Sequence, residues 1–156
     1  MVRYRSVLAL ILVIVTTFLV SCSSPSAVKV PPTYSTAQIE QIQASVPDMQ
    51  ALRDRMKEIP TLLQRREWID IGNFVHGPLA ELRYTMNNVT RKLLPEDREK
   101  ARDLTRDFFD QLVKIDQAAK AADARKVLSN YQEALSDIDS FLNLLPQAVE
   151  ELETES

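Results

Sequence analysis

The fold is decided by residues 68–94, which read WIDIGNFVHGPLAELRYTMNNVTRKLL. Apolar residues recur there at steps of three and four, the spacing of one face of an α-helix. They are Trp68, Ile71, Val75, Leu79, Leu82, Met86, Val89 and Leu93. The pair Gly77-Pro78 interrupts the segment, but the apolar stripe stays in phase across it. We therefore predict one bent helix here rather than two helices.

The segment before this helix has the same amphipathic spacing. Ser35 to Gln38 resembles a capping box, so a first helix is expected to begin there and to continue to Leu63. Pro47 and Pro60 lie inside it, and each removes a backbone donor and clashes with the preceding turn. We expect a kink or a break at both prolines.

Two further amphipathic helices follow. Pro95 is well placed to open the third helix, whose stripe ends at Ala122, and Asp123 to cap the fourth, which ends before Pro146. Short connections make neighbouring helices antiparallel. The sequence thus predicts an all-α fold, an antiparallel up-down-up-down four-helix bundle over residues 36–146.

The first residues are typical of an export signal. Arg3 and Arg5 precede a mainly apolar, uncharged run, residues 7–20, that is shorter than the roughly 18 residues a membrane span needs. Leu19-Val20-Ser21-Cys22 then resembles the lipobox of bacterial lipoproteins, in which the cysteine receives a diacylglyceryl group. Cys22 is the only cysteine of the chain. We expect it to be the lipid attachment site.

The sequence predicts that the chain has four parts. Residues 1–21 are the predicted signal peptide, which is removed, and residues 22–35 are a lipidated tether rich in Ser and Pro. The bundle follows at 36–146, and residues 147–156 form an acidic tail. We expect no structure in the tether or in the tail.

Composition excludes several classes of function. The net charge of −3 argues against a nucleic-acid partner, and two glycines are too few for a phosphate-binding loop. His76 is the only histidine, so a di-iron bundle, which needs two, cannot be built, and we do not expect Ser-His-Asp or Cys-His catalysis. Adventitious zinc at His76 is the one metal site that the composition leaves open. We expect no enzyme and no small-molecule substrate.

Several residues near the centre of the chain are not explained by core packing. Asn73, Phe74, His76, Gly77 and Arg83 lie off or beside the apolar stripe. Aromatic residues and arginine are the usual anchors of protein interfaces. We expect Phe74 and His76 to lie on a partly exposed face beside the kink. On residues alone, a docking surface and an ordinary surface both stay open.

Four strings carry a resemblance to a known family. They are WxxxxNFVHGPLxxLR at 68–83, LLPxDRxKA at 93–101, KIDQAA at 114–119 and YQEALSDIDSFLNLLP at 131–146. In this order they resemble the PsbQ family of extrinsic photosystem II subunits in its cyanobacterial form, across residues 39–146.

The resemblance implies a non-enzymatic subunit without a cofactor, anchored by lipid to the thylakoid membrane on its lumenal side. It would dock near the core antenna and PsbO, help retain calcium and chloride, and support the dimer. The residues implied in partner binding are Trp68, Asn73, Phe74, His76, Arg83 and Asp116. Gly77, Pro78 and Tyr131 are implied as structural. The alternative is a periplasmic lipoprotein on an unrelated bundle that binds a small ligand or senses stress.

Overall fold

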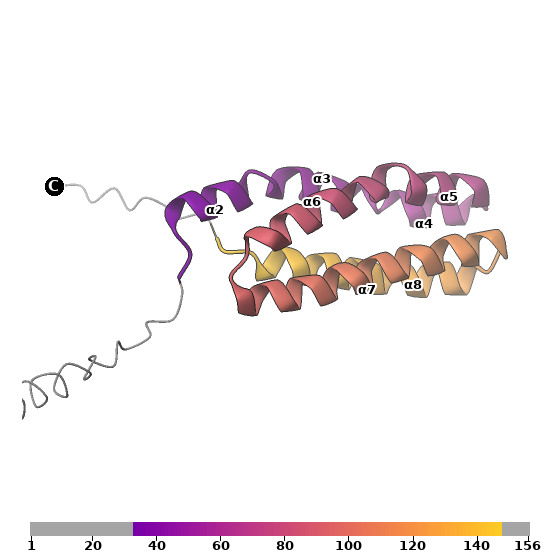
Figure 1. Ribbon diagram of the computed structural model, residues 1–156. Helices are drawn as coiled ribbons and strands as arrows, with labels where there is room; N and C mark the ends of the chain where they lie inside the picture. The colour runs from indigo at the N-terminus through magenta and orange to yellow at the C-terminus, as the bar shows by residue number, and fades with distance from the viewer. Residues whose placement is uncertain (1–32, 148–156) are drawn as a thin grey trace, which may run out of the picture. The chain divides into compact units, whose positions relative to one another are not determined.

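The computed structural model of the chain describes residues 33–147. The predicted signal peptide, Cys22, the tether as far as residue 32 and the acidic tail from residue 148 lie outside the described residues. Within 33–147 the chain forms seven helical segments and no strand (Figure 1). Along this part of the chain, no helix is both long and apolar enough to cross a membrane.

The seven segments make four rods that pack as an antiparallel bundle, which confirms the predicted fold class (Figure 1). The first rod contains α2, α3 and α4, and the second contains α5 and α6. The third and fourth rods are the single helices α7 and α8. Their bounds are α2 Thr36–Gln43, α3 Val46–Arg55, α4 Glu58–Gln64, α5 Trp68–His76, α6 Pro78–Lys92, α7 Pro95–Lys120 and α8 Ala124–Leu144.

The first rod begins at the predicted capping box. The Ser35 hydroxyl accepts from the Gln38 N–H at 3.3 Å, and the Gln38 side chain accepts from the Ser35 N–H at 3.4 Å. The rod is broken twice, each time just ahead of a proline. Pro47 then lies in the first turn of α3 and Pro60 in that of α4, where a missing N–H costs little. The expected interruptions of the first helix are confirmed.

The second rod differs from the prediction of one bent helix. Gly77 separates α5 from α6, with φ −91° and ψ −100°, outside the helical region. Its N–H still donates to the Asn73 carbonyl at 2.9 Å. Pro78 has no N–H for the Phe74 carbonyl, and its ring disfavours helical backbone at residue 77. The prediction of a single helix is therefore wrong, although the apolar stripe does stay in phase.

The third and fourth rods begin where the sequence places them. Pro95 is the first residue of α7, and the Asp123 carboxylate accepts from the Lys126 N–H at 3.1 Å at the start of α8. Ala122, predicted in the stripe of the third helix, is instead exposed with φ 51°. It lies beyond the end of α7, where the Asp123 N–H donates to the Ala118 carbonyl at 2.9 Å.

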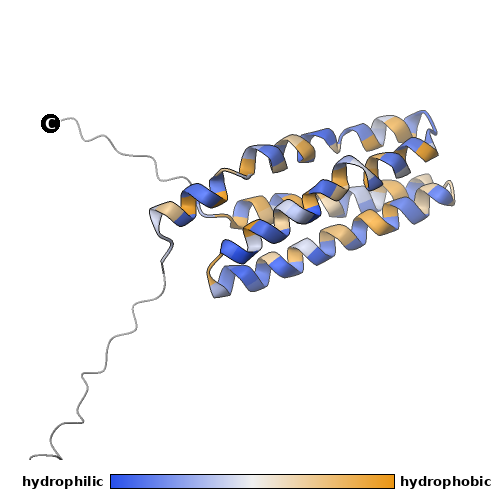
Figure 2. Cartoon of the chain, turned by 45° about the horizontal axis from the view of Figure 1, so that its top comes forward, coloured by the Kyte–Doolittle hydropathy of each residue, from blue (hydrophilic) through white to orange (hydrophobic). Residues whose placement is uncertain are grey.

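Large apolar side chains fill the centre of the bundle. Hydrophobic and hydrophilic residues alternate along every helix, as amphipathic packing requires (Figure 2). Large side chains with no exposed surface come from all four rods and include Ile42, Met56, Leu82, Phe108 and Phe141. At roughly 1.5–3 kcal/mol for each buried large side chain, this core is the main source of stability.

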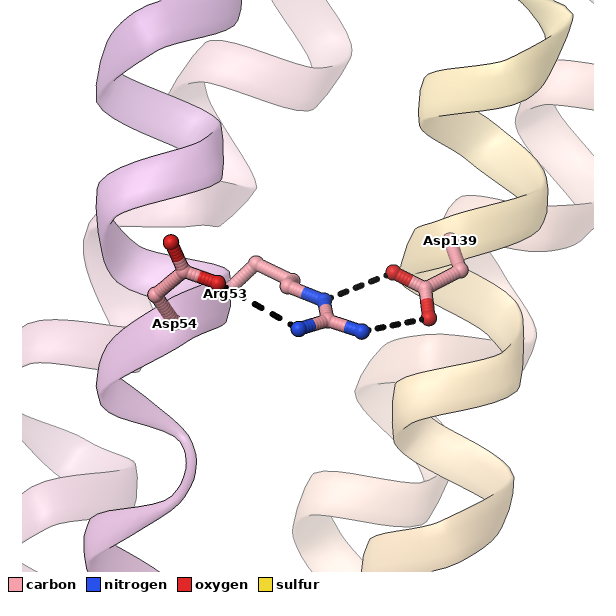
Figure 3. Close-up of polar contacts among 3 residues, drawn as sticks. All are labelled: Arg53, Asp54 and Asp139. Atoms are coloured by element: carbon pink, nitrogen blue, oxygen red, sulfur yellow. Dashed lines mark hydrogen bonds and ion pairs between the residues drawn. The ribbon is translucent and has the colours of Figure 1, made fainter.

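Polar contacts hold the first rod to its neighbours. Arg53 of α3 makes a bidentate pair with Asp139 of α8, at 2.7 and 2.8 Å (Figure 3). Tyr34 donates to Asp97 at 2.6 Å and accepts from the Leu94 N–H at 3.2 Å. Burial and the Asp97 hydrogen bond raise the pKa of Tyr34 to about 12. The chain is thus fixed to the bundle directly before α2 begins.

Candidate functional site

Two hollows lie side by side between the second rod and α7. The first has a volume of about 400 Å³ and is lined by α5 and the end of α7. The second, of about 390 Å³, is lined by residues of α5, α6 and the middle of α7. His76 and Asp116 belong to the lining of both. We call this surface the α5–α7 groove.

A bridge of three polar side chains divides the groove. His76 Nε2 lies 3.1 Å from Asp116 Oδ1, and Lys120 Nζ lies 2.6 Å from Asp116 Oδ2. The Asp116 side chain is only 10% exposed, whereas those of His76 and Lys120 are largely exposed. Burial by itself raises the pKa of Asp116, but the hydrogen bonds from Lys120 and His76 outweigh it and hold that pKa below its ordinary value.

Gly72 allows this bridge to lie close to α5. A Cβ atom at position 72 would be 3.3 Å from Asp116 Oδ1, closer than an ordinary van der Waals contact. A glycine at this helix position costs about 1 kcal/mol relative to alanine. Because Gly72 has no side chain beside the Asp116 carboxylate, α5 and α7 can approach each other closely.

The second hollow combines an aromatic floor with a cation. The Arg83 guanidinium carbon lies 4.1 Å from the centroid of the Phe109 ring. Phe109 in turn meets Phe108 edge to face, with ring centroids 5.0 Å apart. Among residues 33–147, no hydrogen bond uses the Arg83 guanidinium as a donor. Its N–H groups therefore have no acceptor among these residues.

The groove brings together most of the predicted partner-binding residues. Trp68 and Asn73 line the first hollow, Arg83 lines the second, and His76 and Asp116 line both. They come from three helices, and the sequence separation of Asp116 from the others exceeds thirty residues. Bundle packing therefore gathers onto one surface five of the six residues that the resemblance implies.

Phe74 is the exception, and its expected exposure is wrong. Its side chain is 5% exposed and belongs to the core, with the Arg55 guanidinium carbon 5.4 Å from the ring centroid. Residue 74 follows Ile71 by three positions and precedes Val75, so it faces the first rod along with the core stripe. A core side chain covered by Arg55 is not an exposed anchor.

The residues implied as structural lie elsewhere. Gly77 and Pro78 form the break between α5 and α6. Tyr131 is half-buried on α8, where burial raises the pKa of its phenol and the positive charge of Arg53 opposes that rise. It is absent from the lining of the α5–α7 groove.

Sequence reasoning missed several residues of the groove, among them Ile69, Gly72, Phe109, Val113 and Lys120. Lys120 follows Asp116 by four residues, the spacing of a helical ion pair, and that signal could have found it. Ile69 and Val113 are large apolar residues outside the core stripes, and such residues are informative when they gather on a surface. Only the packing of α5 against α7 shows that they share a groove.

Large apolar side chains at the border of the groove are exposed to solvent. Ile69 and Val113 are 80% and 50% exposed. Tyr84 of α6, next in sequence to Arg83, is 75% exposed. The remaining large apolar residue of this kind, Leu128, lies on α8 and is 42% exposed. Ile69 and Val113 therefore lie at the groove, whereas Tyr84 and Leu128 are absent from its lining.

The chemistry of the groove suits binding. No serine, threonine or cysteine belongs to the lining of the two hollows within the described part of the chain, so His76 has no nucleophile to activate there. Between residues 33 and 147, no group of three or more His, Cys, Asp or Glu side chains is placed to hold a metal ion.

Fold and site together define an all-helical bundle with an apolar surface groove that is bordered by cationic side chains. The chain matches the family described as PsbQ, oxygen evolving enhancer protein 3, over residues 3–146. It is 48% identical to CyanoQ of Synechocystis sp. (strain ATCC 27184 / PCC 6803 / Kazusa) over 149 residues, which cover 95% of this chain and 99% of the relative. The chain belongs to the PsbQ family, whose members are non-enzymatic extrinsic subunits of photosystem II.

Proposed function

We propose that the chain is a lumenal subunit of photosystem II, anchored to the thylakoid membrane by lipid on Cys22. It docks near the core antenna and PsbO and stabilises the oxygen-evolving complex by helping to retain calcium and chloride. It also supports the assembled dimer. The high identity to CyanoQ along nearly the whole chain supports this assignment.

One structural observation carries the docking part of the proposal. Trp68, Asn73, His76, Arg83 and Asp116 gather at a single groove. Large exposed apolar residues at its border are the usual mark of an interface that is covered in the assembled state. The proposed docking face is therefore the α5–α7 groove.

A lipid anchor fits weak docking by a bundle of this size. The anchor confines the chain to the surface that carries its partner, so a modest interface suffices for high occupancy. The eleven tether residues between Cys22 and Tyr34, extended at about 3.1 Å each, let the bundle lie roughly 34 Å from the lipid head groups.

The alternative of a ligand-binding lipoprotein has less support. A bundle that encloses a small ligand needs small or polar residues at its centre, whereas this centre is filled by large, fully buried apolar side chains. The hollows lie on the surface, bordered by exposed side chains such as Ile69 and Lys120.

The test is to isolate photosystem II through a tagged core subunit under gentle conditions and to measure this chain in the preparation. We expect it to be retained. We also expect complexes that lack it to lose oxygen evolution faster when calcium and chloride are withdrawn. Its absence from photosystem II, with intact PsbO in the same preparation as a control, would contradict the proposal.

A further inference from the structure

The α5–α7 groove has two compartments of similar size and similar chemistry. The first is bordered by the exposed Ile69 and by Lys120, and the second by the exposed Val113 and by Arg83. Each therefore places one large apolar side chain next to one cationic side chain.

Polar groups at the groove are mainly hydrogen-bond donors. Asp116 is the only carboxylate in the lining of either hollow along the described residues, and His76 and Lys120 already engage its two oxygens. The Lys120 ammonium has three N–H donors and gives one to Asp116. Within residues 33–147, the remaining donors of Lys120 and those of Arg83 make no hydrogen bond to any group of the lining.

From this arrangement we propose that the α5–α7 groove binds an acidic segment of a photosystem II polypeptide, one with apolar side chains next to its carboxylates. The apolar side chains enter the two hollows on either side of the His76–Asp116–Lys120 bridge, and the carboxylates accept from Lys120 and Arg83. This partner chemistry rests on the proposed function, because it assumes that photosystem II is what the groove contacts.

Charge complementarity favours an acidic segment over a second copy of the chain as the occupant of the groove. A second copy of the chain would bring a surface that is acidic on average, since the net charge is −3, but it would also present the same cations to one another across a symmetric contact. An acidic partner segment meets the cations without that repulsion, and such matching fixes orientation and accelerates association.

Two substitutions at Ile69, one acidic and one basic, test whether the partner segment carries negative charge. Its side chain is 80% exposed, so Ile69→Glu and Ile69→Lys both remove the apolar contact without disturbing the core. Against an acidic segment, the glutamate is repelled and the lysine attracted. We expect Ile69→Glu to be retained on photosystem II about fivefold to tenfold less than Ile69→Lys at low ionic strength.

The measurement uses the full chain, produced in Synechocystis cells in place of CyanoQ. Photosystem II is isolated through a tagged core subunit, and the bound chain is quantified per complex at low and at high salt. The difference between the two variants should narrow at high salt, because exposed charges are screened. Leu128→Glu and Leu128→Lys on α8 are the matched controls and should be retained equally. Circular dichroism checks that each variant is folded.

The other outcomes separate the inference from the proposed function. If wild type is retained and the two Ile69 variants do not differ, or if Ile69→Lys is the weaker, the acidic partner is wrong while the subunit assignment stands. If the Ile69 variants lose self-association in cross-linking and keep photosystem II, the occupant is a second copy and the inference fails. If wild type itself is absent from photosystem II, the proposed function fails and this inference with it.

Discussion

Asp116 keeps a carboxylate largely out of solvent in a protein that performs no catalysis. The arrangement is stable because two donors from two helices meet it, Lys120 at 2.6 Å within α7 and His76 at 3.1 Å from α5. Charge-assisted hydrogen bonds of this kind are stronger than neutral ones. If one partner is removed, the other stays buried without a hydrogen bond, which costs free energy. At the scale of single residues, this bridge joins α5 to α7 across the groove.

Asp116→Asn keeps the shape of the side chain and removes its charge. We expect a loss of about 1–3 kcal/mol in the free energy of unfolding at pH 7. Folding lowers the pKa of Asp116, so its contribution is present above the unfolded pKa, near 4, and is lost as the pH falls through the folded pKa. The stability difference between wild type and variant should therefore shrink below about pH 4.

Urea unfolding at pH 7 and at pH 3 measures this difference. Asp110→Asn, at an exposed position of the same helix, is the control and should change stability little at either pH. A difference between wild type and Asp116→Asn that stays constant or grows at pH 3 would show that the charge of Asp116 does not stabilise the fold.

The second rod shows what a single residue does to an element. The stripe from Trp68 to Leu93 predicts one helix, and every member of it is buried or half-buried. The apolar stripe does not reveal the local interruption, because Pro78 removes a donor and restricts Gly77 without shifting the phase of the stripe. Packing of both segments against α7 preserves the common face although the helix itself is broken.

Gly77→Ala tests this break. A Cβ atom at position 77 would lie 2.9 Å from the Asn73 carbonyl oxygen. This oxygen belongs to the backbone, so relieving the contact requires the helix itself to shift. We expect the substitution to cost about 1–3 kcal/mol in stability, as overpacking usually does. Thermal and urea unfolding measure the loss, and Glu81→Ala at an exposed position of α6 is the control. Unchanged stability would mean that α5 and α6 can rejoin without strain.

At the scale of the whole molecule, the lipid and the bundle have separable roles. The bundle has its own core within residues 33–147, so Cys22→Ser should remain helical by circular dichroism. The variant should leave the membrane fraction, and its retention on photosystem II should fall because the effective concentration given by the anchor is lost. Retention of Cys22→Ser on washed membranes at the wild-type level would mean that docking, rather than lipid, holds the chain there.

The sequence by itself determined the all-α class, the four rods and the helix starts at Ser35, Pro95 and Asp123. These features follow from apolar spacing, caps and prolines, which act within one or two helical turns. Tertiary structure alone decided that Phe74 is buried, that Ile69 and Val113 border one groove, and that His76 of α5 meets Asp116 of α7. The physical reason is that a periodic pattern specifies which face of a helix is apolar, whereas contacts between residues forty positions apart depend on how rods pack.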